Sequence, residues 1–214
     1  MIAVITGDII KSRSLGDMQY WLAPIRELLS SFGVSENNWD VYRGDSFQIE
    51  LDYPIEALLL ALSIKSTIKS IRVKSQKQRK SIVDVRLSIG IGEGASKKEK
   101  LGARMGKAHI YSGEGFEALK KIPVNMVIRS EWSDFDQDFN LLLKFALILM
   151  DDWTISSSEI IQILLHNPNI KQDDIARQLH IEQQSVSGRI QRAHAYEIME
   201  LEQHFRLKLK TYLQ

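Results

Sequence analysis

The pattern of hydrophobic residues changes once along the chain, and this change limits the folds that it can form. Before residue 139, short alternating or β-branched runs are separated by segments with helical spacing. Their order is strand, helix, strand, strand, helix, strand, helix, strand. From Phe139 almost to the last residue only helical spacing is found. We therefore expect an α+β fold with a ferredoxin-like mixed sheet, followed by an all-α part.

The expected strands and helices can be placed from local signals. The first strand ends where Gly7-Asp8 predicts a turn, and Arg43-Gly44-Asp45-Ser46 predicts the turn of a hairpin. A composition change near Asp151 predicts two domains, 1–150 and 151–214, joined by a helix over 139–150. The expected strands are 1–6, 39–42, 47–51, 81–91 and 124–128, and the expected helices are 21–32, 54–71 and one from Leu101 that is interrupted near Ser112-Gly113.

Composition excludes several classes of protein. The chain has 214 residues and no cysteine, so a disulfide scaffold, a thiol nucleophile and a Cys-based metal site are excluded. Its 28 basic and 27 acidic residues give no general attraction to nucleic acid. The first residues do not have the pattern of a signal peptide, and no apolar run is long enough for a bilayer. We expect a cytoplasmic protein without a membrane partner.

One segment is strongly basic. No acidic residue lies between Ala57 and Val83. The segment is either a phosphate-facing patch or a solvated helix end followed by a loop, and we favour the second interpretation because no aromatic residue is interleaved for stacking. Its basic residues are Lys65, Lys69, Arg72, Lys74, Lys77, Arg79 and Lys80.

In the segment Lys171–Ala193, apolar residues such as Ile175 and Val186 lie on one face of each of two expected short helices. This pattern resembles the helix-turn-helix of bacterial transcription regulators, in which a glycine is usual at the position of His180. Gln and Arg side chains can read base edges in the major groove. The net charge of −2 over 151–214 opposes DNA binding, and the alternative is a polar face used for packing or protein contacts. The candidate DNA contacts are Gln183, Gln184, Ser185, Ser187, Arg189 and Arg192.

The last helix, over 194–212, has an apolar stripe formed by Ile198, Leu201, Phe205 and Tyr212. Such a stripe is either a dimerisation seam, which a helix-turn-helix reading a two-fold site needs, or a surface that packs within the chain. We favour packing within the chain because only two heptads are present. A second copy of the chain remains one candidate partner.

Two aspartates follow strand signals in the first part of the chain. If the hairpin lies beside the first strand, Asp8 and Asp45 meet at one end of the sheet and form an oxygen site suited to Mg²⁺. Lys11, Ser12 and Arg13 follow Asp8 and are candidates for holding phosphate groups. The alternatives are structural: Asp45 as a turn residue and Asp8 as a helix N-cap.

The motifs GDIIKSR (7–13), YRGDSFQ (42–48), RLSIGIGE (86–93) and SG (112–113) occur in an order that resembles the SatD family of bacterial proteins. The same pieces are more remotely similar to the class III nucleotide cyclases and diguanylate cyclases. That resemblance implies that Asp8, Asp45 and the Ile9 carbonyl hold metal ions over a nucleotide. It adds Lys107 and Arg43 as candidate nucleotide contacts, although diguanylate cyclases have a glycine at the position of Arg43 and an acid at that of Ser46.

Three functions are consistent with these features. We favour a nucleotide- or ligand-sensing, DNA-binding transcription regulator. One alternative is a Mg²⁺-dependent enzyme that acts on a nucleoside triphosphate. The other is a protein-interaction adaptor in which both motifs are structural.

Overall fold

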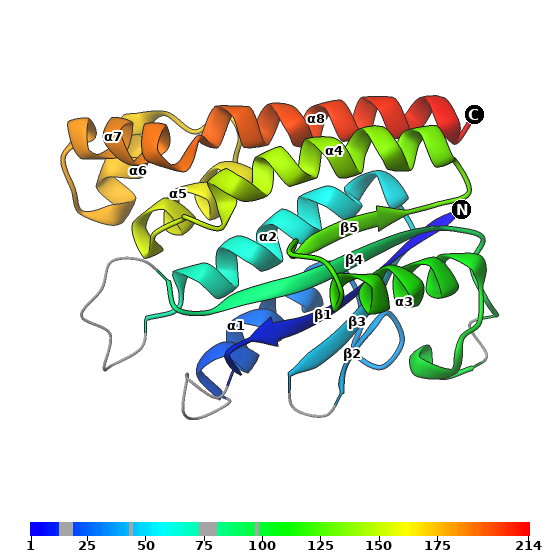
Figure 1. Cartoon of the computed structure of the whole chain (residues 1–214). Coiled ribbons are helices and arrows are strands. Elements are labelled where there is room, and N and C mark those ends of the chain that lie inside the picture. Colours follow the sequence, from blue (N-terminus) through cyan, green and yellow to red (C-terminus); the bar gives the residue numbers. More distant parts are fainter. Residues whose placement is uncertain (13–18, 43–44, 73–80, 97–98) are drawn as a thin grey trace.

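The computed structural model of the chain describes residues 1–12, 19–42, 45–72, 81–96 and 99–214. Over these ranges it is an α+β fold with one five-stranded mixed sheet and eight α-helices (Figure 1). The predicted order of strands and helices is confirmed. The strands are β1 (Ile2–Ile10), β2 (Trp39–Tyr42), β3 (Ser46–Leu51), β4 (Asp84–Gly92) and β5 (Met126–Arg129). The helices are α1 (Gln19–Ser30), α2 (Ala57–Ser70), α3 (Lys107–Leu119), α4 (Ser133–Met150), α5 (Ile155–His166), α6 (Gln172–Leu179), α7 (Gln183–Ala193) and α8 (Ala195–Tyr212), with short 3₁₀ turns η2 (Pro54–Glu56) and η3 (Leu101–Ala103).

The sheet has the strand order β2-β3-β1-β4-β5. β1 lies at the centre and is antiparallel to both of its neighbours, β3 and β4. β2 and β3 form the predicted hairpin, and β5 is parallel to β4. The centre of the sheet is thus made of strands from three separate parts of the sequence.

Two local predictions are wrong. Gly7 and Asp8 do not form a turn, because β1 continues through them to Ile10. A Cβ atom on Gly7 would lie 2.5 Å from the ring of Phe47, so this glycine serves close packing and not chain reversal. The helix is also not interrupted at Ser112-Gly113, which lies inside α3.

The two faces of the sheet differ in polarity. Residues such as Ile5, Ile49 and Ile89 point into the hydrophobic core that α1 and α2 cover. The alternate residues face α3, where Ser112 Oγ is hydrogen-bonded to Thr6 Oγ1 (2.7 Å) and donates to the Ser88 carbonyl (3.1 Å). Because side chains alternate along a strand, one face is apolar and the other carries a row of polar side chains.

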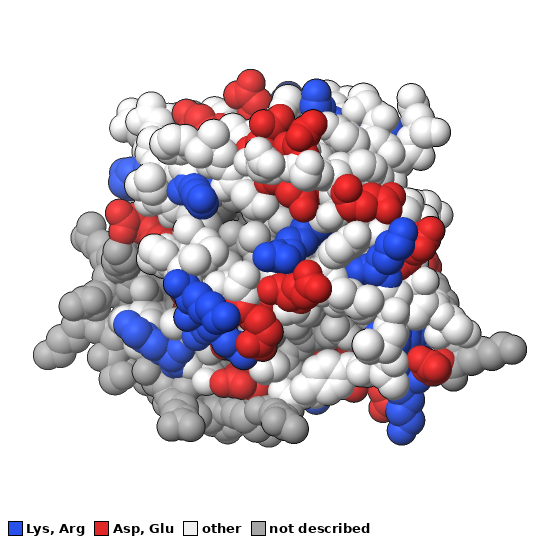
Figure 2. Space-filling model, turned by 45° about the vertical axis from the view of Figure 1, so that its right-hand side comes forward, with Lys and Arg blue, Asp and Glu red and all other residues white. Residues whose placement is uncertain are grey.

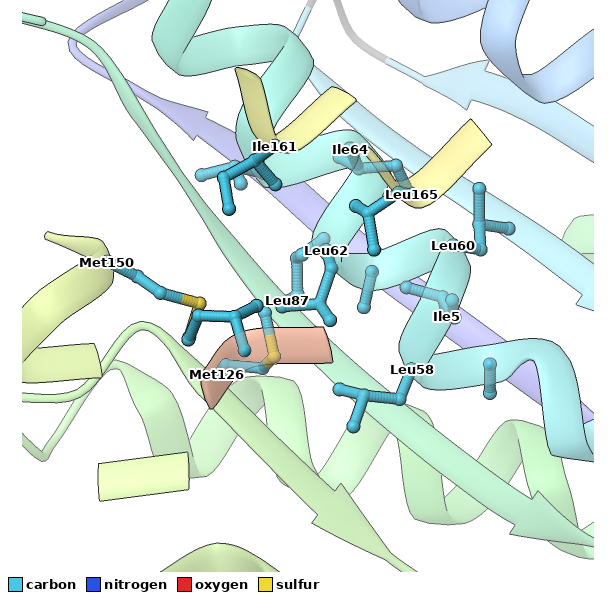
Figure 3. Close-up of a cluster of buried hydrophobic side chains, with 14 of the residues drawn as sticks. Ile5, Leu58, Leu60, Leu62, Ile64, Leu87, Met126, Met150, Ile161 and Leu165 are labelled. Atoms are coloured by element: carbon cyan, nitrogen blue, oxygen red, sulfur yellow. The ribbon is translucent and has the colours of Figure 1, made fainter. Parts of the chain in front are cut away.

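Helix α2 is covered on nearly all sides. Ten of its 14 residues are buried, which is typical of a helix enclosed between two layers. One side packs on the sheet and another on α5. Figure 3 shows these contacts through Leu62 and Ile64 of α2, Leu87 of β4, and Ile161 and Leu165 of α5.

Both basic residues of α2 are buried, so the solvated interpretation is wrong for Lys65 and Lys69, whereas Arg72, just after the helix, is exposed. Lys65 and Lys69 are 0% and 2% exposed. Lys65 Nζ lies 2.8 Å from Asp84 Oδ1 and 2.7 Å from Asp151 Oδ1, and Lys69 Nζ lies 3.2 Å from Asp84 Oδ2. Opposite charges allow the burial, because each ammonium exchanges water for carboxylate oxygens. Lys74, Lys77, Arg79 and Lys80 lie outside the described residues.

The C-terminal helices share the core of the first part. A continuous set of buried apolar residues runs from Ala3 of β1 to Leu209 of α8, across the predicted boundary at 150/151. Lys65 crosses the same boundary through Asp151, and Gln162 Nε2 of α5 donates to the Ser66 carbonyl of α2 (3.0 Å). Residues 151–214 therefore pack on the sheet's helical layer.

The apolar stripe of α8 packs within the chain, as we favoured. Ile198 and Phe205 are 1% and 0% exposed. The ring of Phe205 lies 5.3 Å from Phe139 and 5.8 Å from Phe135 of α4, and Tyr212 lies 5.4 Å from Trp132. None of the helices in the described parts of the chain has the length and apolar composition needed to cross a bilayer.

Candidate functional site

The structure brings Asp8 and Asp45 together. Asp45 lies in the turn before β3, and Asp8 is in register with the next residue, Ser46. The Ile9 N–H donates to the Asp45 carbonyl (3.1 Å), and Ser12 Oγ donates to Asp45 Oδ2 (3.0 Å). The predicted convergence of these residues at one end of the sheet is therefore what the backbone pairing produces.

The carboxyl group of Asp8 is held in an unfavourable environment for its charge. Burial raises the pKa of Asp8, the Arg86 guanidinium opposes this rise, and the neighbouring charge of Asp45 adds to it. Arg86 Nε lies 3.4 Å from Asp8 Oδ1, beyond the usual range of a strong charged hydrogen bond. Among the described residues, Asp8 Oδ1 is buried and receives no hydrogen bond. A ligand that offers positive charge to this oxygen would satisfy it.

Asp8 and Asp45 fit Mg²⁺ on the condition that a phosphate ligand supplies further oxygen atoms. The described residues contain no group of three His, Cys, Asp or Glu side chains suited to a metal ion. Mg²⁺ is commonly held by one or two carboxylates together with substrate phosphates and water. The buried acceptor of Asp8 and the adjacent Asp45 supply two such carboxylates, so the site suits Mg²⁺ that arrives with a phosphate ligand. Bound Mg²⁺ would supply charge neutralisation for phosphate oxygens.

The candidate phosphate contacts are only partly brought together. Ser12 is half-buried beside Asp45, whereas Lys11 follows β1 with a left-handed backbone (φ 61°) and an exposed side chain. Arg13 and Arg43 lie outside the described residues.

Lys107 does not lie near Asp8. Its Cβ is close to Gly92, which pairs with Ile2 at the opposite end of β1. Gly92 lies six positions along β4 from Arg86, the partner of Asp8, which is about 20 Å of strand. Lys107 Nζ instead lies 3.4 Å from both Glu93 and Glu131.

Lys120 is a second cation near Asp8, besides Arg86, that sequence reasoning missed. It follows the last residue of α3, and its charge opposes the rise that burial causes in the pKa of Asp8. Its Nζ is 2.6 Å from Glu117 Oε1 and 5.7 Å from the centre of the Phe116 ring. The available signal was the length of the helix: 13 residues span about 20 Å, so the two ends of α3 lie over opposite ends of the sheet.

Helices α6 and α7 are joined by a turn of three residues, 180–182. His180 adopts a left-handed backbone (φ 53°, ψ 47°), the conformation that a glycine at this point would favour. Ile175 of α6 and Val186 of α7 are fully buried, and Ile190 is 3% exposed. The predicted apolar faces thus hold the two helices together and against α5, leaving the opposite side of α7 to solvent.

The candidate DNA contacts on α7 have different surroundings. Gln183, Gln184, Ser185 and Arg192 are exposed and Ser187 is half-buried. Gln183 Nε2 donates to Gln172 Oε1 (2.6 Å). Arg189 turns toward the protein, where its Nη1 lies 3.2 Å from Glu159 Oε2 and its side chain is 20% exposed. Glu159 also pairs with Arg72 of the segment after α2 (2.8 Å). Arg189 therefore ties α7 to α5.

Positive charge is not concentrated on the face of the molecule seen in Figure 2. Lys and Arg side chains there are interspersed with Asp and Glu. Electrostatic attraction over this face therefore gives no preference for a polyanion.

Comparison of the chain with protein-family models, curated proteins and solved structures finds no match.

Proposed function

We propose that the chain is a DNA-binding transcription regulator of SatD type that responds to a ligand. The observation that carries the proposal is the arrangement of α7: its buried face fixes it against α5 and α6, while Gln183, Gln184 and Ser185 at its N-terminal end are exposed. In helix-turn-helix proteins the N-terminal residues of the second helix contact base edges.

We assign different roles in DNA binding to the polar residues of α7 according to their surroundings. Gln184 is exposed and makes no hydrogen bond to a described residue, so it is the best candidate for reading an adenine edge. Arg192 is exposed one helical turn after Arg189 and is a candidate phosphate contact. Arg189, paired with Glu159, positions α7.

Selection from a random pool of duplex DNA at low salt tests this proposal. We expect a preferred sequence to which Gln184→Ala binds about 5- to 150-fold more weakly, since a good base contact contributes about 1–3 kcal/mol. Arg192→Ala should weaken binding to all sequences and reduce the salt dependence. Gln203→Ala, an exposed glutamine on α8, is the matched control and should leave affinity unchanged. Failure to enrich any sequence, or equal losses in the Gln184 and Gln203 variants, would contradict DNA binding.

The ligand that we propose for the sheet is a nucleotide with Mg²⁺. The strand order β2-β3-β1-β4, with antiparallel neighbours throughout, supports the ferredoxin-like and cyclase-like arrangement that the resemblance implies. The buried acceptor of Asp8 beside Asp45 favours a second candidate function at the same site, Mg²⁺-dependent chemistry on a nucleoside triphosphate.

A thermal-shift panel of nucleoside triphosphates with Mg²⁺ or chelator tests the site, and product analysis after incubation separates sensing from turnover. A ligand at 100 times its Kd stabilises by about 2.7 kcal/mol. We expect a Mg²⁺-dependent shift that is lost in Asp8→Ala and kept in Asp134→Ala, an exposed aspartate of α4. No shift with any triphosphate would refute the nucleotide site. A chain that binds neither DNA nor nucleotide would favour the third function, a protein-interaction adaptor.

A further inference from the structure

A cleft of about 560 Å³ opens between the layer that covers the sheet and the α5–α6 region. Residues at the end of α1 and along α2 form one wall. The other wall comes from α5, from the connection to α6, and from Gln178 on α6 itself. Cavities of about 300–1,000 Å³ are typical of small-molecule sites.

Part of the lining of this cleft is apolar. This part includes Leu28, Phe32, Leu59, Ile163 and Ile170, all of which are partly exposed. Leu59 belongs to the stripe of α2 that is not buried, which continues through Ser63 and Thr67 along the same wall. Because burial of apolar surface is favourable, an occupant with an apolar body would be stabilised here.

The cleft also has polar side chains, of which Ser31, Asn167 and Gln178 are exposed. The hydroxyl groups of Ser31 and Ser63 donate to backbone carbonyls one helical turn earlier, at Leu28 (2.6 Å) and Leu59 (2.8 Å). The side chains of Asn167 and Gln178 make no hydrogen bond within the described parts of the chain and are exposed. They can therefore bond to a ligand without breaking an existing interaction.

The lining also sets the charge of the occupant. It contains no Asp, Glu, Lys or Arg side chain, and its one ionisable side chain is the exposed imidazole of His166. A charged ligand would lose hydration without gaining a permanent opposite charge from the lining, whereas a neutral one with a hydrogen-bonding end matches both the apolar residues and the exposed amides.

We propose that this cleft is a binding site for an uncharged, amphipathic small molecule with an apolar body and a hydrogen-bonding group at one end. Its walls belong to different functional parts: α1 and α2 are packed on the sheet, and Gln178 belongs to the helix that supports α7. An occupant that prefers one placement of α6 shifts the population toward it and thereby changes affinity for DNA. This second step rests on the proposed DNA-binding function.

Two fluorescent probes with the same ring skeleton test the chemistry. N-phenyl-1-naphthylamine is uncharged, and 1-anilinonaphthalene-8-sulfonate carries a negative charge. We expect saturable, one-to-one binding of the uncharged probe to the full chain, at least ten-fold tighter than binding of the sulfonate. Tighter binding of the sulfonate, or no saturable binding of the uncharged probe, overturns the proposal.

A matched pair of variants locates the probe. Ser31 and Ser30 are neighbouring exposed residues, but only Ser31 lines the cleft. Ser31→Trp should reduce affinity for the uncharged probe at least ten-fold by occupying the cleft, and Ser30→Trp should not. Equal affinities in the two variants would place the probe elsewhere and overturn the assignment.

The regulatory step is measured separately with the selected DNA. We expect a change of at least three-fold in DNA affinity when the uncharged probe saturates the wild type, and no change in Ser31→Trp. Probe binding without this change overturns the coupling but not the site. If selection enriches no DNA sequence in the absence of probe, the result contradicts the proposed DNA-binding function and not the cleft. The fluorescence titration measures probe binding in the cleft without DNA.

Discussion

Replacing Lys65 by Met should lower the free energy of unfolding, because Lys65 connects the sheet to the C-terminal helices through an ion pair on each side. The Lys65 side chain is fully buried and its Nζ contacts Asp84 and Asp151 at 2.8 and 2.7 Å. Removing one partner of a buried ion pair costs about 3–5 kcal/mol. Asp84 keeps Lys69 at 3.2 Å, and Asp151 is 41% exposed and can be hydrated. We therefore expect the lower end of the range, about 3 kcal/mol.

Thermal unfolding followed by circular dichroism measures this effect. For a chain of this length, about 3 kcal/mol corresponds to a fall in Tm of about 6–12 °C. Lys107→Met is the matched control: the same change removes an ammonium that is 47% exposed and paired at 3.4 Å, so the effect should be small. A Lys65→Met variant with the Tm of the wild type would refute the argument and show that the network costs as much in desolvation as it contributes in attraction.

Three further predictions concern α3 and the residues beneath it. Gly90→Ala should lower the free energy of unfolding by about 2–3 kcal/mol, because its Cβ would lie 2.2 Å from a backbone oxygen of α3. Gly113→Ala, whose Cβ would have no atom within 4 Å, should raise the free energy of unfolding by about 0.5–1 kcal/mol. Urea titrations that rank the two variants the other way would contradict the packing of α3. Burial lowers the pKa of His109 below its ordinary 6.5, so the unfolded chain binds the proton more tightly and stability should fall as pH decreases from 7 to 5. His109→Gln should show a smaller fall in Tm over this range; an equal fall would assign the pH dependence to other groups. Burial raises the pKa of Asp8, with Arg86 opposing the rise, so ionisation of this carboxyl group opposes folding and Asp8→Asn should raise the Tm at pH 7. A lower Tm for this variant would mean that attraction to Arg86 dominates.

The order of the elements could be predicted because it depends on local periodicity. In the sequence, alternating runs stand on both sides of a Gly-Asp dipeptide, so tertiary contacts are not needed to recognise the hairpin of β2 and β3. Gly7-Asp8 offers the same dipeptide, yet there the chain stays extended. The difference lies in Phe47 and Leu87, which approach Gly7 from the two neighbouring strands and are far from it in sequence.

The candidate site could be predicted in part for the same reason. Asp8 and Asp45 meet because strand pairing alone brings a strand and the adjacent hairpin together. The charges around them depend on registers and helix lengths that periodicity does not determine, which explains why Arg86 and Lys120 were missed and Lys107 was proposed.

The buried lysines show the limit of sequence reasoning most clearly. In the sequence, Lys65 and Lys69 belong to a basic run without a nearby acid. The carboxylates that compensate Lys65 are 19 and 86 residues away along the chain. No local pattern distinguishes such a residue from a solvated one, because the compensation exists only after the two parts of the chain have packed.

The position of α2 restricts how this chain can be divided or recombined. One side of this helix needs the sheet and another side needs α5. A truncation after residue 150 would uncover a large apolar surface, and residues 151–214 alone would expose the complementary one. The last four helices are therefore not a unit that could be transferred to another protein by itself. Any transfer, by evolution or by an engineer, has to supply a substitute for α2 and a counter-ion for Asp151.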